Sequence, residues 1–311
     1  MNKNKIFCTG CQQKSAEEVG IINPTNRFAG RVLSRILVGG KLWHCGNCDL
    51  KFRWPALSDE ELEFLYEAGS IDAWNTEYYE REDWNTALHW ITSKLPSQSK
   101  VLDVGCFNGA FLENLGGSYQ RFGIEISSSA AKIAAKKGIN VVGSSIHSIN
   151  DEVEFYDCVT VFDVIEHVRN PEEFLVTILE KIKVGGYVIV STGNSDAWAF
   201  RTMGSNYWYC TIAEHISFVN PRWISGFCKK NNASIGDQKF FCHKKGADKF
   251  DNQLLDLLKN IVYKISPNLS ALLRKIGVGG DFARTEPNLL HHPPNWKSAR
   301  DHFITIIKKS S

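Results

Sequence analysis

From Lys100 onward, short apolar runs alternate with longer amphipathic stretches along the chain. Continuous apolar runs are typical of buried parallel strands, and the segments between them have the spacing of crossover helices. The predicted strands are 101–104, 122–126, 141–142, 156–162, 187–191, 235–243 and 302–308, and the predicted helices are 109–115, 128–137 and 171–183. The alternation predicts an α/β fold, a Rossmann-like seven-stranded sheet with helices on both faces.

The rest of the chain predicts smaller units around this sheet. Residues 1–57 are expected to form a small domain, and 58–98 an aromatic-rich helical linker on the substrate side that opens with a capping box at Ser58. Residues 99–311 then form the α/β domain, with a helical insertion at about 245–296. The amphipathic part of this insertion fits core packing, a substrate lid or a membrane-surface contact.

Four cysteines near the N-terminus have the spacing of a metal site. They form two C-x2-C pairs with 33 residues between them: Cys8, Cys11, Cys45 and Cys48. Each pair can present two thiolates on one turn, and two such turns complete a tetrahedral S4 site that suits Zn²⁺. We therefore expect one structural zinc ion per chain in a zinc ribbon, with extra strands in the long intervening segment.

The net charge of +2 hides an uneven distribution. Residues 1–57 carry nine Lys and Arg against three acids, residues 58–242 carry fifteen against twenty-five, and residues 243–311 carry twelve against six. Basic ends of this kind favour an anionic partner, such as a phosphorylated substrate, nucleic acid or a membrane surface, although solvated surface charge gives the same pattern. Nine cysteines, with neither a secretory signal nor an apolar membrane span, lead us to expect a cytoplasmic location.

The stretch VLDVGCFNGAFL, residues 101–112, predicts a strand that turns tightly into a helix beside a ligand. Its pattern is D-x-G-x-x-x-G. A dinucleotide site instead has G-x-G-x-x-G, and the residues before its first glycine are apolar because the loop binds a pyrophosphate. Asp103, two residues before Gly105, would repel a phosphate and suits a cationic ligand. Glu125, at the end of the next strand, can accept both hydroxyls of a ribose. A cationic adenosine without phosphates indicates S-adenosylmethionine (SAM).

These motifs resemble those of class I SAM-dependent methyltransferases. The loop at 101–109 is similar to the first motif of that family, and four further stretches follow in the family's order: 122–126, 156–167, 183–190 and 191–194. The resemblance covers about residues 99–311. It implies that the cofactor lies at the carboxyl ends of the first strands of the sheet.

The resemblance also implies which residues bind SAM. Asp103, Gly105 and Gly109 would lie near the methionyl end together with the loop residues Cys106 and Phe107, Glu125 would bind the ribose, and Ile126 would lie under the adenine. The remaining expected cofactor contacts are Ser145 and Ile146 near the adenine and Asp163 and Val164 beside the amino-acid moiety. Phe107 stands where the family usually has glycine, which is tolerated without strain if its φ is below zero.

The front half is similar to bacterial methyltransferases that carry an N-terminal zinc ribbon and are associated with sugars or surface polysaccharides. In that subgroup a Tyr before the core domain, a His after the fourth strand and a Glu-His pair after the fifth take part in catalysis. The corresponding candidates here are Tyr79, His167 and the pair Glu214 and His215. His215 beside a carboxylate is the expected base, with a pKa near neutral. A packing or capping role remains an alternative for these residues.

Three functions fit the sequence. The leading hypothesis is SAM-dependent methyl transfer to a small, anionic, sugar-containing acceptor, nucleotide-linked or polysaccharide-related. An RNA methyltransferase that grips the phosphate backbone with its basic ribbon is the second. A SAM-binding module without catalytic activity is the third, and the intact pair of Asp103 and Glu125 weighs against it.

Overall fold

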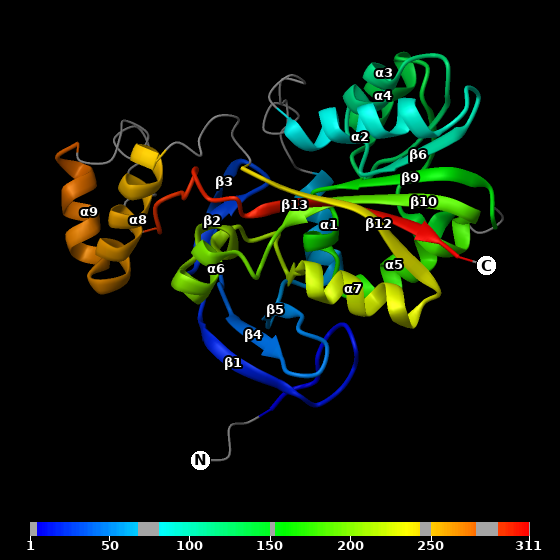
Figure 1. Ribbon diagram of the computed structural model, residues 1–311. Helices are drawn as coiled ribbons and strands as arrows, with labels where there is room; N and C mark the ends of the chain where they lie inside the picture. Colours follow the sequence, from blue (N-terminus) through cyan, green and yellow to red (C-terminus); the bar gives the residue numbers. More distant parts are fainter. Residues whose placement is uncertain (1–4, 68–80, 150–152, 243–249, 278–291, 311) are drawn as a thin grey trace.

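The computed structural model describes residues 5–67, 81–149, 153–242, 250–277 and 292–310 of the 311-residue chain. Two β-structures dominate these segments, an antiparallel sheet near the N-terminus and a larger mixed sheet (Figure 1). No helix in the described ranges combines the length and the apolar character needed to cross a bilayer.

The N-terminal sheet has the order β1-β4-β5-β11 and is antiparallel throughout. Its strands are β1 (Ala16–Ile21), β4 (Lys41–Cys45), β5 (Lys51–Trp54) and β11 (Ser217–Phe218), and a separate hairpin is formed by β2 (Thr25–Phe28) and β3 (Arg31–Leu37). Strands between the two cysteine pairs agree with the expectation from their wide spacing. Because β11 comes from the region 99–311, the N-terminal sheet is joined to the α/β part by main-chain hydrogen bonds.

The larger sheet has seven strands, as predicted, in the order β12-β13-β10-β9-β6-β7-β8. Its strands are β6 (Lys100–Val104), β7 (Gln120–Ile124), β8 (Asn140–Gly143), β9 (Tyr156–Phe162), β10 (Ile182–Gly193), β12 (Ala233–Phe241) and β13 (His302–Lys309). The first five run parallel, and β13 is antiparallel to β10 and β12. β6 lies centrally, so the loop after it opens at the switch point of the sheet, where ligands bind in such folds.

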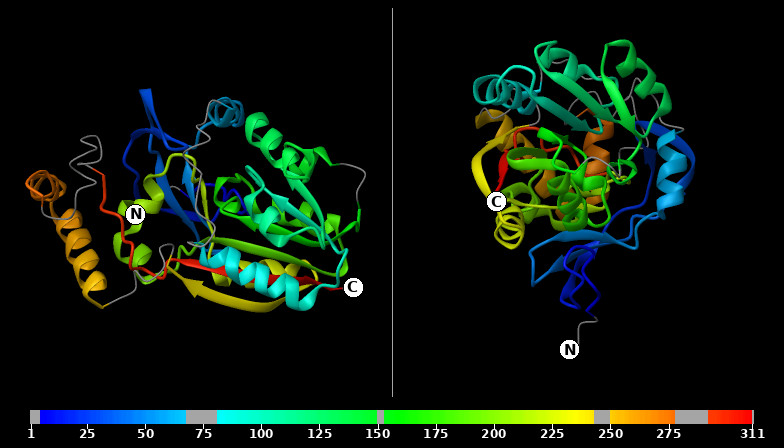
Figure 2. Two further views of the ribbon diagram at one scale, coloured as in Figure 1. Left: turned by 90° about the horizontal axis from the view of Figure 1, so that it is seen from above. Right: turned by 90° about the vertical axis from the view of Figure 1, so that its right-hand side faces the viewer.

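Helices cover both faces of this sheet (Figures 1 and 2). One face carries α2 (Glu82–Lys94), α3 (Ala110–Leu115) and α4 (Ser128–Lys136), and the other carries α5 (Pro171–Lys181) and α7 (Pro221–Lys230). The capping box at Ser58 is followed by α1 (Asp59–Glu67), and α6 (Trp198–Met203) follows β10. Asn170 and Asn220 cap α5 and α7 with their side chains, each before a proline in the first turn.

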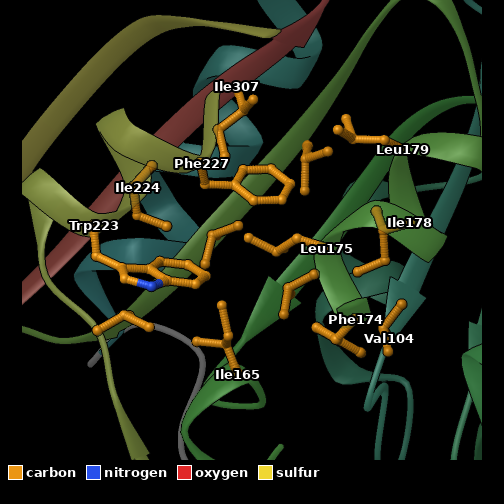
Figure 3. Packing of buried hydrophobic residues seen from close by; sticks show 14 of the residues in the cluster. Val104, Ile165, Phe174, Leu175, Ile178, Leu179, Trp223, Ile224, Phe227 and Ile307 are labelled. Carbon is orange, nitrogen blue, oxygen red and sulfur yellow. The ribbon is translucent and has the colours of Figure 1, made fainter. Parts of the chain in front are cut away.

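The core below the sheet shows why these helices form where they do. Figure 3 shows Leu175 of α5 facing Ile224 and Phe227 of α7. Trp223, the residue before Ile224, belongs to the same buried cluster and lies within reach of the N-terminal cysteine turn, 4.0 Å from where a Cβ on Gly10 would be. One continuous apolar core therefore holds the N-terminal sheet against the α/β sheet.

Two helices lie inside the predicted insertion at about 245–296. They are α8 (Phe250–Ile265) and α9 (Pro267–Lys275), packed against each other as a hairpin. The hairpin stands beside α6 and the β2–β3 hairpin (Figures 1 and 2). Residue 79, the position of the predicted tyrosine, lies outside the described residues.

Candidate functional site

A cavity of about 430 Å³ opens at the carboxyl ends of β6, β7 and β9. This volume is in the range of sites that bury a cofactor or drug-sized ligand. Ten of the eleven predicted cofactor contacts line it: Asp103, Gly105, Cys106, Phe107, Glu125, Ile126, Ser145, Ile146, Asp163 and Val164. The eleventh, Gly109, is not among the lining residues. A Cβ there would meet Ile139 Cδ1 at 2.2 Å, so the position needs glycine for packing and for its φ of +75°.

The carboxyl group of Asp103 lies at the floor of the cavity and is almost fully buried, with 3% exposure. Thr160 donates a hydrogen bond to Oδ1 at 2.7 Å. Burial raises the pKa of Asp103 to about 7, and the negative charges of Glu125 and Asp83 add to the effect, while the bond from Thr160 and the charge of Arg81 oppose it. A cationic ligand in the cavity would stabilise the deprotonated, anionic form of this buried carboxyl group.

Glu125 follows the last residue of β7 and connects the two loops that flank the cavity. Its Oε2 accepts a hydrogen bond from the backbone N–H of Phe107 at 2.8 Å, and its Oε1 accepts one from that of Ser127 at 2.7 Å. Burial raises the pKa of Glu125, and these two N–H donors oppose the rise. Each carboxylate oxygen has a second lone-pair direction, so the side chain can still accept from the hydroxyls of a ribose.

The expectation that the φ of Phe107 lies below zero is wrong. Its φ is +47°, in the left-handed region, so phenylalanine occupies a conformation that favours glycine. The bond from its N–H to Glu125 holds the backbone in this conformation. Gly105, with φ of +77°, is required for a second reason, because a Cβ there would meet Val164 Cγ2 at 2.6 Å.

A polar cluster lies at the other end of the cavity, where β9 ends. His167 lines the cavity, and its Nδ1 is 2.8 Å from the hydroxyl of Tyr66 and 3.1 Å from the carbonyl oxygen of Glu214. A carbonyl can only accept, so this contact is a hydrogen bond when Nδ1 carries the proton; the backbone carbonyl of Asp163 is a second hydrogen-bond acceptor for the ring. Burial lowers the pKa of His167, which keeps the ring neutral at physiological pH.

His215 and Glu214 are positioned differently from what the sequence suggested. His215 is 6% exposed and is not among the lining residues; its ring lies 4.9 Å from that of His167, centroid to centroid. Its Nδ1 is 3.1 Å from the carbonyl oxygen of Tyr209, and the Glu214 carboxylate accepts the backbone N–H of Ala29 at 3.0 Å. Burial, reinforced by the charges of His167 and Arg53, lowers the pKa of His215 well below 6.5. The expectation of a near-neutral pKa is therefore wrong.

The four predicted metal ligands come together at the edge of the N-terminal sheet. Their sulfur atoms lie within 4.8 Å of one another, and two pairs, Cys8 with Cys48 and Cys11 with Cys45, are each 3.7 Å apart. Zn–S bonds of about 2.3 Å place neighbouring sulfur atoms of a tetrahedron about 3.8 Å apart. Ser15 Oγ lies 3.0 Å from the sulfur of Cys45. The arrangement fits a four-coordinate metal ion with no open position.

A comparison with protein families identifies the family of the chain that forms this cavity. Residues 76–235, just over half of the chain, match the methyltransferase domain family. The chain belongs to this family. It is a SAM-dependent methyltransferase, as the sequence predicted.

Curated relatives of the methyltransferase align with about half of it. A mitochondrial ubiquinone biosynthesis O-methyltransferase of Schizosaccharomyces pombe is 29% identical over 170 residues, which cover 47% of this chain and 59% of the relative. Ubiquinone biosynthesis O-methyltransferases of Burkholderia multivorans and of an Azoarcus species are each 29% identical, covering 53% and 58% of this chain and 78% and 77% of their own. None of these three names refers to a sugar.

Solved structures agree on the fold of the methyltransferase. The [4+2]-cyclase SpnF is 15% identical, with a TM-score of 0.51 over 82% of this chain and 97% of its own. The MccD protein is 14% identical, with a TM-score of 0.50 over 73% of this chain and 96% of its own. Identities this low carry no information on the substrate.

The sequence did not identify two residues of the methyltransferase cavity, Tyr66 and Arg81. Tyr66 is an apolar-face position of α1 by spacing, and only its contact with His167 indicates another role. Arg81 donates to Asp83 and Asp163, at 2.6 and 2.7 Å, and its guanidinium lies 4.8 Å from the ring centroid of Trp84. Its place in the cavity suits a carboxylate such as that of a methionyl group. The sequence around it, EYYERED, holds no signal for this role.

Proposed function

We propose that this methyltransferase methylates a hydroxyl oxygen of a small acceptor with little negative charge, and that His167 is the base. The observation that carries the proposal is the position of His167. It is a neutral imidazole that lines the cavity, at the end away from Glu125 and Ile126, and its Nδ1 lies 3.1 Å from a carbonyl oxygen. The relatives named O-methyltransferases support an oxygen acceptor.

The cofactor would be held by residues of the loops after β6 and β7. Asp103 would face its cationic part, Glu125 its ribose, and Arg81 its carboxylate. When bound, SAM supplies a methyl group on a positively charged sulfur, a charge that disappears as the methyl group leaves. The protein therefore has to align the acceptor and remove its proton, and a positioned base contributes about 10²–10⁴-fold to such a step.

His167 would take the proton of the acceptor hydroxyl on the ring nitrogen that carries no proton. The Glu214 carbonyl and the Tyr66 hydroxyl, both within 3.1 Å of Nδ1, hold the ring in one orientation and stabilise the imidazolium that forms. Trp84, Phe162 and Val168 line the cavity and exclude water from it. Tyr66 acts in this scheme as a positioning residue.

The charges around the cavity favour a neutral acceptor over a nucleotide-linked one. Among the described lining residues, Arg81 is the side chain with a permanent positive charge, and it is held by Asp83 and Asp163. A diphosphate brings at least two negative charges, which need cations of their own. A neutral sugar hydroxyl and a phenolic hydroxyl both satisfy this condition, so a sugar acceptor stays within the proposal.

Labelled SAM tests the proposal. The protein is offered phenols, neutral glycosides, nucleotide-sugars and RNA fragments, and the labelled product is identified by mass spectrometry. We expect label on oxygen of a neutral hydroxyl compound. Label on a nucleotide-sugar or on RNA would overturn the choice of acceptor, and a failure to bind SAM or S-adenosylhomocysteine in calorimetry would overturn methyl transfer to any acceptor.

The cysteine cluster supports a second proposal, that it binds one structural zinc ion. We predict about one zinc per chain by atomic emission, lost in Cys45→Ser, because three remaining thiolates bind Zn²⁺ much more weakly than four. Cys228→Ser, a cysteine outside the cluster, is the matched control and should keep its zinc. Metal-free protein that is fully folded would contradict the proposal.

A further inference from the structure

The helix α8 turns its polar side chains inward and its apolar side chains outward. Leu254, Leu258 and Ile265 lie on one face by their spacing and are 48%, 54% and 80% exposed. On the opposite face, Asp256 is 8% exposed and Tyr263 is 1% exposed. A surface helix of a globular protein has the reverse arrangement, so the outward face of α8 needs an explanation.

Hydrogen bonds hold α8 in this orientation. Asp256 Oδ2 accepts from the backbone N–H and the hydroxyl of Ser298, at 2.9 and 2.8 Å. The Tyr263 hydroxyl accepts from Asn23 Nδ2 at 2.8 Å. Rotating the helix to bury its leucines would break these bonds and leave buried polar groups unsatisfied. The outward apolar face is therefore a stable feature of the fold.

α9 repeats the pattern next to it. Leu269, Leu272 and Ile276 follow the spacing of one helix face and are 47%, 57% and 64% exposed, whereas Ser270 and Ala271 are buried. The two helices pack against each other. Together they expose a set of large apolar side chains, which we call the hairpin face and define by its members: Leu254, Leu255, Leu258, Ile265, Leu269, Leu272 and Ile276.

Positive charge surrounds the hairpin face. Lys264 and Lys275 are exposed, Lys259 is partly exposed, and all three lie at its margins by their helical positions. Asp256, the acid on these two helices whose side chain is described, points inward. Apolar side chains bordered by lysines are typical of helices that lie in the interface of an anionic membrane.

We propose that the hairpin face docks on the surface of an anionic lipid bilayer. Its leucines and isoleucines would enter the boundary between headgroups and acyl chains, and Lys259 and Lys275 would contact the phosphates. A second copy of this chain is a poorer partner, because two hairpin faces packed together would bring lysines of the same sign next to each other. Charge complementarity therefore favours lipid.

The hairpin lies at the end of the sheet where the cavity opens. Lys264 Nζ donates to the carbonyl of Thr202 on α6, the helix that follows the carboxyl end of β10 (Figure 1). The cavity opens at the carboxyl ends of the strands parallel to β10. Docking by this face would bring the cavity end of the enzyme toward the membrane, where acceptors dissolved in lipid are found.

Vesicle flotation with the full chain tests this proposal. Vesicles of phosphatidylcholine with about one third phosphatidylglycerol are compared with phosphatidylcholine alone, at low and high salt. We expect binding to the anionic vesicles, weakened by salt, and at least tenfold lower partitioning for the double variant Leu254→Gln with Leu258→Gln. Both leucines are exposed, so the variant keeps its fold. Lys259→Gln with Lys275→Gln should remove most of the salt dependence.

A matched control uses two exposed valines elsewhere, Val153→Gln with Val184→Gln, at 67% and 53% exposure, and should bind vesicles as the parent does. Equal vesicle binding by the leucine variant and its parent would overturn the proposal. So would a dimer in light scattering that the leucine variant converts to a monomer without lipid. SAM affinity should be the same in all variants, so the result is independent of the proposed function.

Discussion

The two ends of the cavity are built from different kinds of sequence. At the end that would bind the adenosine, the lining residues come in short contiguous groups: 103–108, 124–127 and 144–147, each just where a strand ends. At the other end, Tyr66 and His167 meet across 101 residues of chain, and the carbonyl that contacts His167 comes from Glu214. Spacing in the sequence can reveal the first kind of site, whereas the second exists only after the elements have packed.

The strongest test of this contrast compares the two histidines. We predict that His167→Ala lowers kcat by about 10²–10⁴-fold, the usual contribution of a positioned base, whereas His215→Ala lowers it by less than about tenfold. The reason is that His167 lines the cavity and His215 lies behind it. Turnover and SAM affinity are measured for both variants.

The control for the histidine pair is His147→Ala, which removes another imidazole from the cavity lining. It lies beside Ile146, at the expected adenine end, so kcat should change little. A larger loss of turnover in His215→Ala than in His167→Ala would return the role of base to His215, as the sequence suggested.

At the adenosine end, Glu125→Ala should weaken SAM binding by about 100-fold. The variant loses the acceptor for the ribose and also leaves the N–H groups of Phe107 and Ser127 without their carboxylate, and hydrogen bonds to charged groups contribute about 1.5–3 kcal/mol each. Isothermal titration calorimetry with SAM measures the effect. Glu125→Gln, which keeps one acceptor oxygen, should fall between.

A surface glutamate provides the comparison for Glu125. Glu113→Ala removes an exposed carboxylate that pairs with Lys137 at 2.8 Å on the outside of the molecule. Its SAM affinity should equal that of the parent protein. If both variants bind SAM normally and melt at the temperature of the parent, the carboxylate of Glu125 has no part in the cofactor site.

The sequence predicted the α/β sheet and the cofactor loops because each depends on local patterns. All seven strands were predicted within a few residues of their observed ends, except that β10 begins at Ile182 rather than 187. Glu214 and His215 show which contacts local patterns cannot predict. Adjacent in sequence, they point to different partners, Ala29 and Tyr209, because the N-terminal hairpin packs against this loop. No local pattern contains that contact.

The affinity of the adenosine end of the cavity for SAM should depend on pH because of Asp103. Burial first, and then neighbouring carboxylates, raise its pKa to about 7, so the free protein carries a proton there at lower pH. A cationic ligand binds the deprotonated form. SAM affinity should therefore rise by up to about tenfold per unit between about pH 5 and about pH 7, and level off above. Calorimetry across this range measures the slope.

Asp103→Asn is the control for that slope, because an amide does not titrate. Its SAM affinity should be lower than that of the parent above about pH 7 and should stay nearly constant across the same range. A parent affinity that does not change with pH would mean that Asp103 keeps its charge in the free protein, and that burial in this cavity does not favour the neutral acid.

The smallest expected effect concerns Phe107, where sequence and backbone disagree. Its φ of +47° is strained for any residue with a Cβ, at about 1–2 kcal/mol. Phe107→Ala and Phe107→Gly lose the same ring, so their difference isolates the backbone term. We predict that the glycine variant is more stable than the alanine variant by about 1 kcal/mol in urea unfolding.

Ala131→Gly in the interior of α4 is the opposite case, because there a glycine destabilises a helix by about 0.5–1 kcal/mol. The two glycine substitutions should thus have opposite signs relative to alanine in the same chain. A glycine variant at 107 that is less stable than the alanine variant would show that the bond from this N–H to Glu125 does not hold the loop in the left-handed conformation. The loop at the ribose end would then take its conformation only when the ligand binds, whereas the acceptor end is formed by the packing of the protein itself.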